Sequence, residues 1–302
     1  MLAIGRILCP VDFSDASAYA VEQAVAVARW SGASLTALHV EEPLFIEVPA
    51  FGEGVDRVSE ERLGLAVERT TAFFDGAVAA GVPTSVCVHV GLPVPTILER
   101  AAMLPADLIV MGTHGLSGFK HLMLGSVTEK VLRSATCPVL TVPPRAQATS
   151  ALPVRRILCA VDFSDWSRGA LALAGAFVAD AGATLDVVHV IEWPWKEPPQ
   201  PDLGALTAAQ AGALLELRRY FEASAGKRLQ TWIAAAVPGD CTAEVHVCHG
   251  KPYVEILRLA DERRADLIVM GVHARGLLDM ALFGSTTNHV VRQAACPVLT
   301  VR

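Results

Sequence analysis

Glycine and serine residues in the first half of the chain are spaced in a pattern that suits an anion site. Gly112, Gly115 and Gly125 precede Ser126, and residues 126–134 then have the pattern of a helix. Glycine lets backbone N–H groups approach a ligand closely, and a helix start attracts negative charge. The spacing predicts a polyphosphate site with Ser126 as the helix N-cap. A glycine-rich loop with an ordinary serine cap explains the spacing equally well.

Other residue types offer less chemistry. His114 lies inside the glycine loop, but no nucleophile or carboxylate accompanies it in sequence, so loop packing is favoured over catalysis. His39 is expected to make structural hydrogen bonds. The run His246-Val-Cys248-His249 places only two ligands on one strand face, and no second pair follows at metal-ligand spacing. We therefore predict no catalytic residue and no metal site.

The chain is an internal repeat. Residues 6–15 recur at 156–165 with an offset of 150, whereas residues 106–112 and 137–142 recur at 265–271 and 296–301 with an offset of 159. The second copy therefore contains nine extra residues. With 302 residues in total, we predict a first domain at 1–143, a Pro-rich linker at 144–153 and a second domain at 154–302.

Within each copy, short apolar runs alternate with longer helical patterns. This order predicts an α/β fold with a parallel sheet covered by helices on both faces, and ligands at the carboxyl ends of the strands. In the first copy the predicted strands are residues 7–11, 34–40, 85–90, 108–111 and 139–142. The predicted helices are residues 16–31, 58–80, 94–104 and 126–134.

Composition limits the partners. The chain is 52% hydrophobic, and its net charge of −6 is opposite in sign to that of a typical nucleic-acid binder. Its most apolar helical stretch, residues 170–179, is too short to cross a bilayer. Seven cysteines, an odd number, favour a reducing compartment over secretion. We expect a cytoplasmic protein that binds neither nucleic acid nor membrane.

The motifs together resemble the universal stress proteins in their tandem two-domain form. The resemblance rests on the strand end Pro10-Val-Asp12-Phe-Ser, the run at 107–112, and the pattern G-x2-G-x9-G-[S/T] beginning at Gly112. It implies a five-stranded parallel sheet of flavodoxin-like or nucleotide-hydrolase-like form in each copy. It also implies ATP binding, with Mg²⁺, where the glycine pattern is kept, and domains that pair through their final strands.

Carried over residue by residue, the resemblance implies one nucleotide site in each copy. In the second copy Ala274 replaces the second glycine of the pattern and Ala160 replaces Pro10, which leaves the occupancy of that site open. The implied residues of the first site are Pro10, Asp12, Val40, Met111, Gly112, Gly115, Gly125, Ser126 and Val127. Those of the second site are Asp162, Val190, Gly271, Gly284, Ser285 and Thr286.

The expected function is that of an ATP-binding regulator of the stress response that acts by binding rather than turnover. A homodimer and an unidentified protein partner are implied by the same resemblance. Two alternatives stay open. One is a slow ATPase, and the other is a ligand-free scaffold that presents a surface to other proteins.

Overall fold

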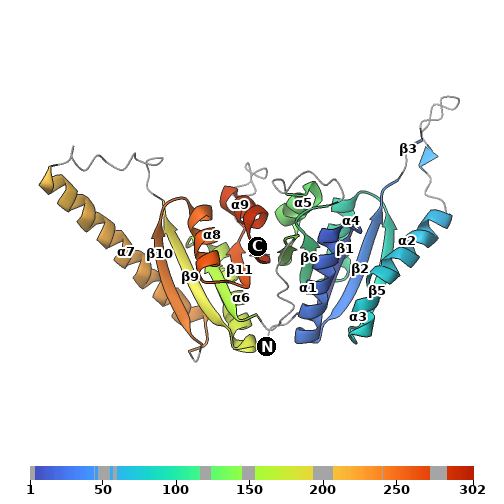
Figure 1. The fold of residues 1–302 in the computed structure, drawn as a ribbon, viewed down its shortest axis with the longest axis horizontal. Coiled ribbons are helices and arrows are strands. Elements are labelled where there is room, and N and C mark those ends of the chain that lie inside the picture. Colours follow the sequence, from blue (N-terminus) through green and yellow to red (C-terminus); the bar gives the residue numbers. More distant parts are fainter. Residues whose placement is uncertain are drawn as a thin grey trace. The chain divides into compact units, whose positions relative to one another are not determined.

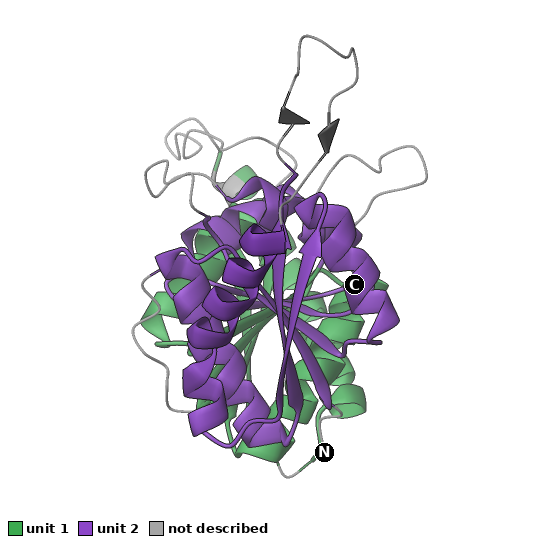
Figure 2. Ribbon diagram, turned by 90° about the vertical axis from the view of Figure 1, so that its right-hand side faces the viewer, with its two compact units in different colours: residues 1, 154–271 green, residues 2–153, 272–302 purple. Residues whose placement is uncertain are grey.

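The computed structural model describes residues 4–43, 45–46, 55–56, 60–115, 124–144, 154–192, 207–239, 241–272 and 284–302. They group into two compact units, shown in Figure 2. One contains residues 154–271, and the other combines residues 2–153 with residues 272–302. The predicted linker lies outside the described residues except for Pro144. None of the described helices is long and apolar enough to span a bilayer.

The first copy forms a five-stranded parallel sheet, in the spatial order β5-β2-β1-β6-β7. This arrangement confirms the predicted fold class, and each predicted strand is present to within one residue at either end. The strands are β1 (Arg6–Val11), β2 (Ser34–Glu41), β5 (Thr84–Val90), β6 (Leu108–Gly112) and β7 (Val139–Val142). After β2 the chain also forms a small antiparallel pair, β3 (Phe45–Ile46) with β4 (Val55–Asp56).

Helices cover both faces of this sheet (Figure 1). Parallel crossovers are right-handed, so the connections from β1 to β2 and from β2 to β5 place α1, α2 and α3 on one face. The connections that return to β6 and β7 place α4 and α5 on the opposite face, where these two helices contact each other. The helices are α1 (Asp15–Ser31), α2 (Glu60–Phe73), α3 (Asp75–Ala79), α4 (Pro93–Met103) and α5 (Ser126–Ser134).

One predicted helix is divided in two. The pattern over residues 58–80 predicts a single helix, but α2 ends at Phe73 and α3 begins at Asp75. Between them Phe74 has φ −108° and ψ 9°, and its side chain is fully buried. The chain leaves helical geometry at this residue while its ring enters the core, which is a tertiary effect that periodicity does not report.

The second copy repeats the arrangement. In its unit the strand order is β10-β9-β8-β11, all parallel, which matches β5-β2-β1-β6 of the first copy. The strands are β8 (Arg156–Ala160), β9 (Thr184–Ile191), β10 (Ala243–His249) and β11 (Leu267–Gly271). The helices are α6 (Asp165–Ala181), the 29-residue α7 (Ala208–Ala236) and α8 (Pro252–Glu262).

The last two elements of the second copy belong to the unit of the first. These are α9 (Ser285–Gln293) and β12 (Val298–Val301), and β12 pairs antiparallel with β7. The hydroxyl of Thr141 donates to the carbonyl of Val298, and that of Thr300 donates to the carbonyl of Val139, each at 3.1 Å. The two final strands therefore pair within one chain, as the resemblance implies.

Candidate functional site

A cavity lies at the carboxyl ends of the strands of the first copy, where the strand order reverses. From β1 the chain proceeds to β2 on one side, whereas β6 lies on the other side, so the ends of β1 and β6 diverge. The cavity has a volume of about 590 Å³. All nine residues assigned to the first site line it, namely Pro10, Asp12, Val40, Met111, Gly112, Gly115, Gly125, Ser126 and Val127.

Asp12 follows β1, lines the cavity and is hydrogen-bonded to the start of α1. Its Oδ1 accepts hydrogen bonds from the Ser14 amide at 3.1 Å and from the Ser14 and Ser17 hydroxyls, both at 2.6 Å. Its Oδ2 faces Gly115, because a Cβ added at that glycine would lie 2.6 Å from this oxygen. One carboxylate oxygen is thus held by α1, and the other meets the glycine loop.

Gly112, which lines the cavity, is also required for packing. A Cβ at this position would lie 2.9 Å from the carbonyl carbon and oxygen of Ala16, so glycine lets α1 lie close against β6. In the second copy a Cβ at Gly271 would lie 2.7 Å from the Ser167 amide nitrogen in α6. The glycine pattern therefore combines a structural position, Gly112, with a position that faces the cavity, Gly115.

The start of α5 differs from the sequence prediction. The N-cap is Gly125, with no side-chain cap, and Ser126 is the first helical residue with an exposed side chain. The Ser126 hydroxyl is therefore not the predicted cap. The amide of Gly125 donates to the Thr113 carbonyl at 2.8 Å, and the Thr128 hydroxyl donates to the Gly112 carbonyl at 2.8 Å. These bonds tie the helix start to the end of β6.

Residues 116–123 of the glycine loop lie outside the described part of the chain. His114, just before them, lines the cavity, and its Nδ1 lies 2.9 Å from the Thr113 hydroxyl. The prediction that His114 packs within the loop rather than catalyses stays a prediction.

Sequence reasoning missed a stack of side chains at the cavity wall. The Phe13 ring contacts both the guanidinium of Arg69, 4.0 Å from its ring centre, and the ring of His39, at 4.4 Å. In the second copy Phe163 likewise contacts both Arg228 and His189, at 4.1 and 4.4 Å. All three residue types recur at the repeat offsets of 150 and 159, which is the signal that could have found them.

Polar side chains continue this wall. His39 Nδ1 donates to the Val11 carbonyl at 2.9 Å, and its Nε2 lies 3.1 Å from Glu41 Oε2. Glu41 also forms an ion pair with Arg62 of α2. The expected structural role of His39 is confirmed by the first of these bonds. His39, Glu41, Arg62 and Arg69 all line the cavity, so its rim carries charges of both signs.

The second copy repeats the Asp12 turn with one change. Asp162 Oδ1 accepts from the Ser164 amide at 3.0 Å and from its hydroxyl at 2.5 Å. The Ser167 hydroxyl donates to the Ser164 carbonyl at 3.0 Å, whereas Ser17 bonds the carboxylate in the first copy.

The remaining residues of the second site are divided. Val190 lies in β9 and Gly271 ends β11, in the same unit as Asp162. Gly284 caps α9 and Ser285 and Thr286 begin it, and these three are grouped with the other unit. Ala274 lies outside the described residues. The second nucleotide site therefore stays a prediction.

Comparison with known proteins finds the same family in both halves of the chain. A model of the universal stress protein family matches residues 3–143 and again residues 153–302. A universal stress protein of Methanocaldococcus jannaschii is 35% identical over 140 residues, which cover 45% of this chain and 81% of that protein. A universal stress protein of Mycolicibacterium smegmatis is 27% identical over 303 residues, which cover 98% of this chain and 96% of that protein.

A solved structure covers the whole chain. The crystal structure of a universal stress protein from Archaeoglobus fulgidus is similar with a TM-score of 0.67 at 25% identity, covering 100% of this chain and 98% of that one. Both halves of the sequence match the same family model, and the fold agrees over the full length. The chain therefore belongs to the universal stress protein family and contains its domain twice in tandem.

Proposed function

We propose that the first copy binds ATP, as its Mg²⁺ complex, and that the protein is a cytoplasmic stress-response regulator acting through this binding. The observation that carries the proposal is the convergence of Asp12, Gly115 and the start of α5 on one cavity of about 590 Å³. Sites for small molecules typically enclose about 300–1,000 Å³ and combine apolar walls with a few placed polar groups.

The two ends of the cavity suit the two ends of a nucleotide. The first N–H groups of α5 have no acceptor within the helix, and the helix dipole adds positive potential there, so the amides of Ser126 and Val127 are placed to hold phosphates. The Gly125 amide donates to the Thr113 carbonyl, and this residue lines the cavity beside them. Asp12 can accept hydrogen bonds from ribose or adenine. Pro10 and Val40, at the ends of β1 and β2, supply apolar walls for the base.

The second copy is proposed as a second site, made of Asp162, Val190, Gly271, Gly284, Ser285 and Thr286. Ala274 adds a methyl group where the first copy has Gly115, which faces the Asp12 carboxylate. We therefore expect weaker binding there. A homodimer and a protein partner that responds to the nucleotide state complete the proposal, with domain limits of 1–143 and 154–302.

The first test is the nucleotide content of gently purified protein, released by denaturation and quantified per chain. About one ATP per chain supports the first site, and about two supports both sites. ADP in place of ATP, with turnover that is lost in His114→Ala, would favour the slow ATPase. No nucleotide, together with no binding of added Mg-ATP, would overturn the proposal and leave the scaffold.

Gly115→Val tests the site itself. Its Cβ would lie 2.6 Å from Asp12 Oδ2, so the loop or the carboxylate must move, and we expect the Kd for ATP to rise at least about tenfold, or about 1.4 kcal/mol. Gly76→Ala is the matched control, because its Cβ meets nothing within 4 Å. Titration calorimetry measures both variants, and equal affinities would contradict the assignment of Gly115.

Asp12→Asn tests the carboxylate. It keeps an oxygen that can accept from Ser14 and Ser17 but removes the charge and one acceptor, so the start of α1 is retained. We expect weaker ATP binding with little change in the free energy of unfolding. A stable variant with undiminished affinity would remove Asp12 from the proposed site.

A further inference from the structure

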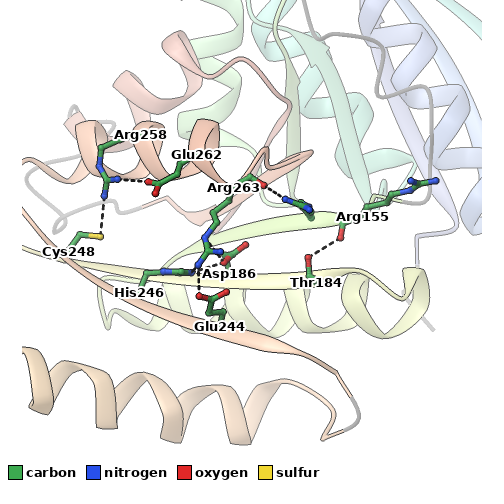
Figure 3. Close-up of polar contacts among 10 residues, drawn as sticks. Arg155, Thr184, Asp186, Glu244, His246, Cys248, Arg258, Glu262 and Arg263 are labelled. Carbon is green, nitrogen blue, oxygen red and sulfur yellow. Dashed lines mark hydrogen bonds and ion pairs between the residues drawn. The ribbon is translucent and has the colours of Figure 1, made fainter.

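Three side chains of types that can bind a metal converge in the second copy, and none of them belongs to the proposed nucleotide site. The ligand atoms of Asp186 in β9 and of Glu244 and His246 in β10 all lie within 4.8 Å of one another (Figure 3). Asp186 and Glu244 are Cα partners across the two parallel strands. His246 follows two residues later and therefore lies on the same face of the sheet.

The two carboxylates, opposite each other on neighbouring strands, need a positive charge beside them. Like charges directly opposite each other on neighbouring strands destabilise a sheet, and the Asp186 side chain is only 10% exposed. In the structure Arg263, which follows α8, supplies the charge. Its Nε lies 3.5 Å from Asp186 Oδ1, it forms an ion pair with Glu244, and one of its terminal nitrogens lies 3.4 Å from His246 Nε2.

The first copy shows that the fold does not require this cluster. The repeat offsets place Thr36 opposite Ser85, Cys87 where His246 stands and Leu104 where Arg263 stands. The Thr36 and Ser85 hydroxyls lie 3.2 Å apart, so the same strand pair is formed there by neutral groups. The charged cluster is therefore a property of the second copy alone.

Arg263 lines two cavities. One of about 220 Å³ is lined by Asp186, Glu244 and Arg263, and another of about 580 Å³ by His246, Cys248 and Arg263 among others. Arg263 is the C-cap residue of α8, and its side chain is 34% exposed. A rotation of this side chain into solvent would leave the three donor groups open to an ion from either cavity.

We propose that Asp186, Glu244 and His246 bind a divalent transition-metal ion of the Zn²⁺ class, and that the Arg263 guanidinium holds the place of the ion in its absence. Two carboxylate oxygens and one imidazole nitrogen suit such ions and leave a further coordination position for water. A dication neutralises the two carboxylates as Arg263 leaves. His246 Nε2 lies 2.6 Å from Asp186 Oδ1, so the imidazole nitrogen and the carboxylate oxygen already face each other at the proposed site.

Co²⁺, which replaces Zn²⁺ in such sites and absorbs visible light, is the probe. It is titrated into the full chain without added nucleotide. We expect one saturable site whose spectrum lacks the intense near-ultraviolet band of thiolate ligation. His246→Ala should weaken binding at least about tenfold. Cys248→Ala, the control for a neighbouring thiol, should leave it unchanged.

Arg263→Gln distinguishes a metal site from a network of salt bridges. Removing the competing guanidinium should tighten Co²⁺ binding, and this outcome does not depend on whether His246→Ala folds. Binding that is no tighter in Arg263→Gln, binding that survives in folded His246→Ala, or a thiolate spectrum lost in Cys248→Ala would each overturn the proposal.

Discussion

At the scale of single residues, one phenylalanine of the cavity wall, Phe13, has a strained backbone conformation. Phe13 and Phe163 both have φ 64°, a left-handed conformation that costs a non-glycine residue roughly 1–3 kcal/mol. The contacts of each ring with an arginine and a histidine offset this cost. The same strained conformation occurs in both copies, directly after Asp12 and Asp162. It is therefore part of the turn that positions each carboxylate.

We expect His189, the histidine that contacts Phe163, to make the stability of the protein depend on pH. Burial lowers the pKa of His189 below its usual 6.5, against the smaller effect of its bond to the Val161 carbonyl. Between the folded-state pKa and 6.5 the unfolded chain binds more protons than the folded chain, so stability falls as the pH drops through this range.

We therefore expect His189→Asn to reduce this pH dependence, because the asparagine amide can still donate to the Val161 carbonyl but does not titrate. Urea unfolding at about pH 5.5 and about pH 7.5 measures the difference. The parent should lose more stability on acidification than the variant. Equal losses would show that His189 does not carry the effect.

At the scale of elements, the close contact of α1 with β6 depends on Gly112. In Gly112→Ala the new methyl group would lie 2.9 Å from the Ala16 backbone, so α1 must move away from the sheet. We expect a loss of about 1–3 kcal/mol in the free energy of unfolding, which is typical of overpacking. Urea denaturation measures it.

Gly64→Ala in α2 is the matched control for that substitution. Its Cβ meets nothing within 4 Å, and alanine favours a helix over glycine, so a gain of about 0.5–1 kcal/mol is expected. If the two variants shifted stability in the same direction, close packing at Gly112 would not be the cause.

At the scale of the whole molecule, the last strand of the chain completes the unit that contains the first copy. β7 and β12 have the same sequence, Val-Leu-Thr-Val, and pair antiparallel, with Leu140 opposite Leu299. Each threonine hydroxyl donates to the other strand. Strand β12 thus covers an edge that would otherwise present unpaired backbone groups.

A fragment of residues 1–153 is therefore expected to dimerise, with β7 of a second molecule taking the place of β12. Light scattering after size-exclusion chromatography gives its mass. Thr141→Pro in the same fragment should remain a monomer, because proline has no N–H to donate to a partner strand. A monomeric parent fragment would contradict this account of the β7 edge.

Much of this arrangement was predictable from the sequence. Apolar runs are a local signal, and they placed the strands of the first copy. The nine residues assigned to its site came from the resemblance to the universal stress proteins, and all nine line the cavity. The repeat supplied the tandem organisation, because two matching halves must fold alike. Asp12 and Gly115 were predictable as neighbours because the carboxyl ends of parallel strands meet at one edge of a sheet.

Only the tertiary structure decided the features that depend on what packs against what. Burial of Phe74 divides one predicted helix. Gly125 rather than Ser126 is the cap of α5, at a point where its amide donates to the Thr113 carbonyl at the end of β6. Asp186 and His246 lie far apart in the chain and on different strands, so no local spacing could relate them. The physical reason is that periodicity reports which face of an element is apolar, whereas strand order and side-chain packing determine which polar groups meet.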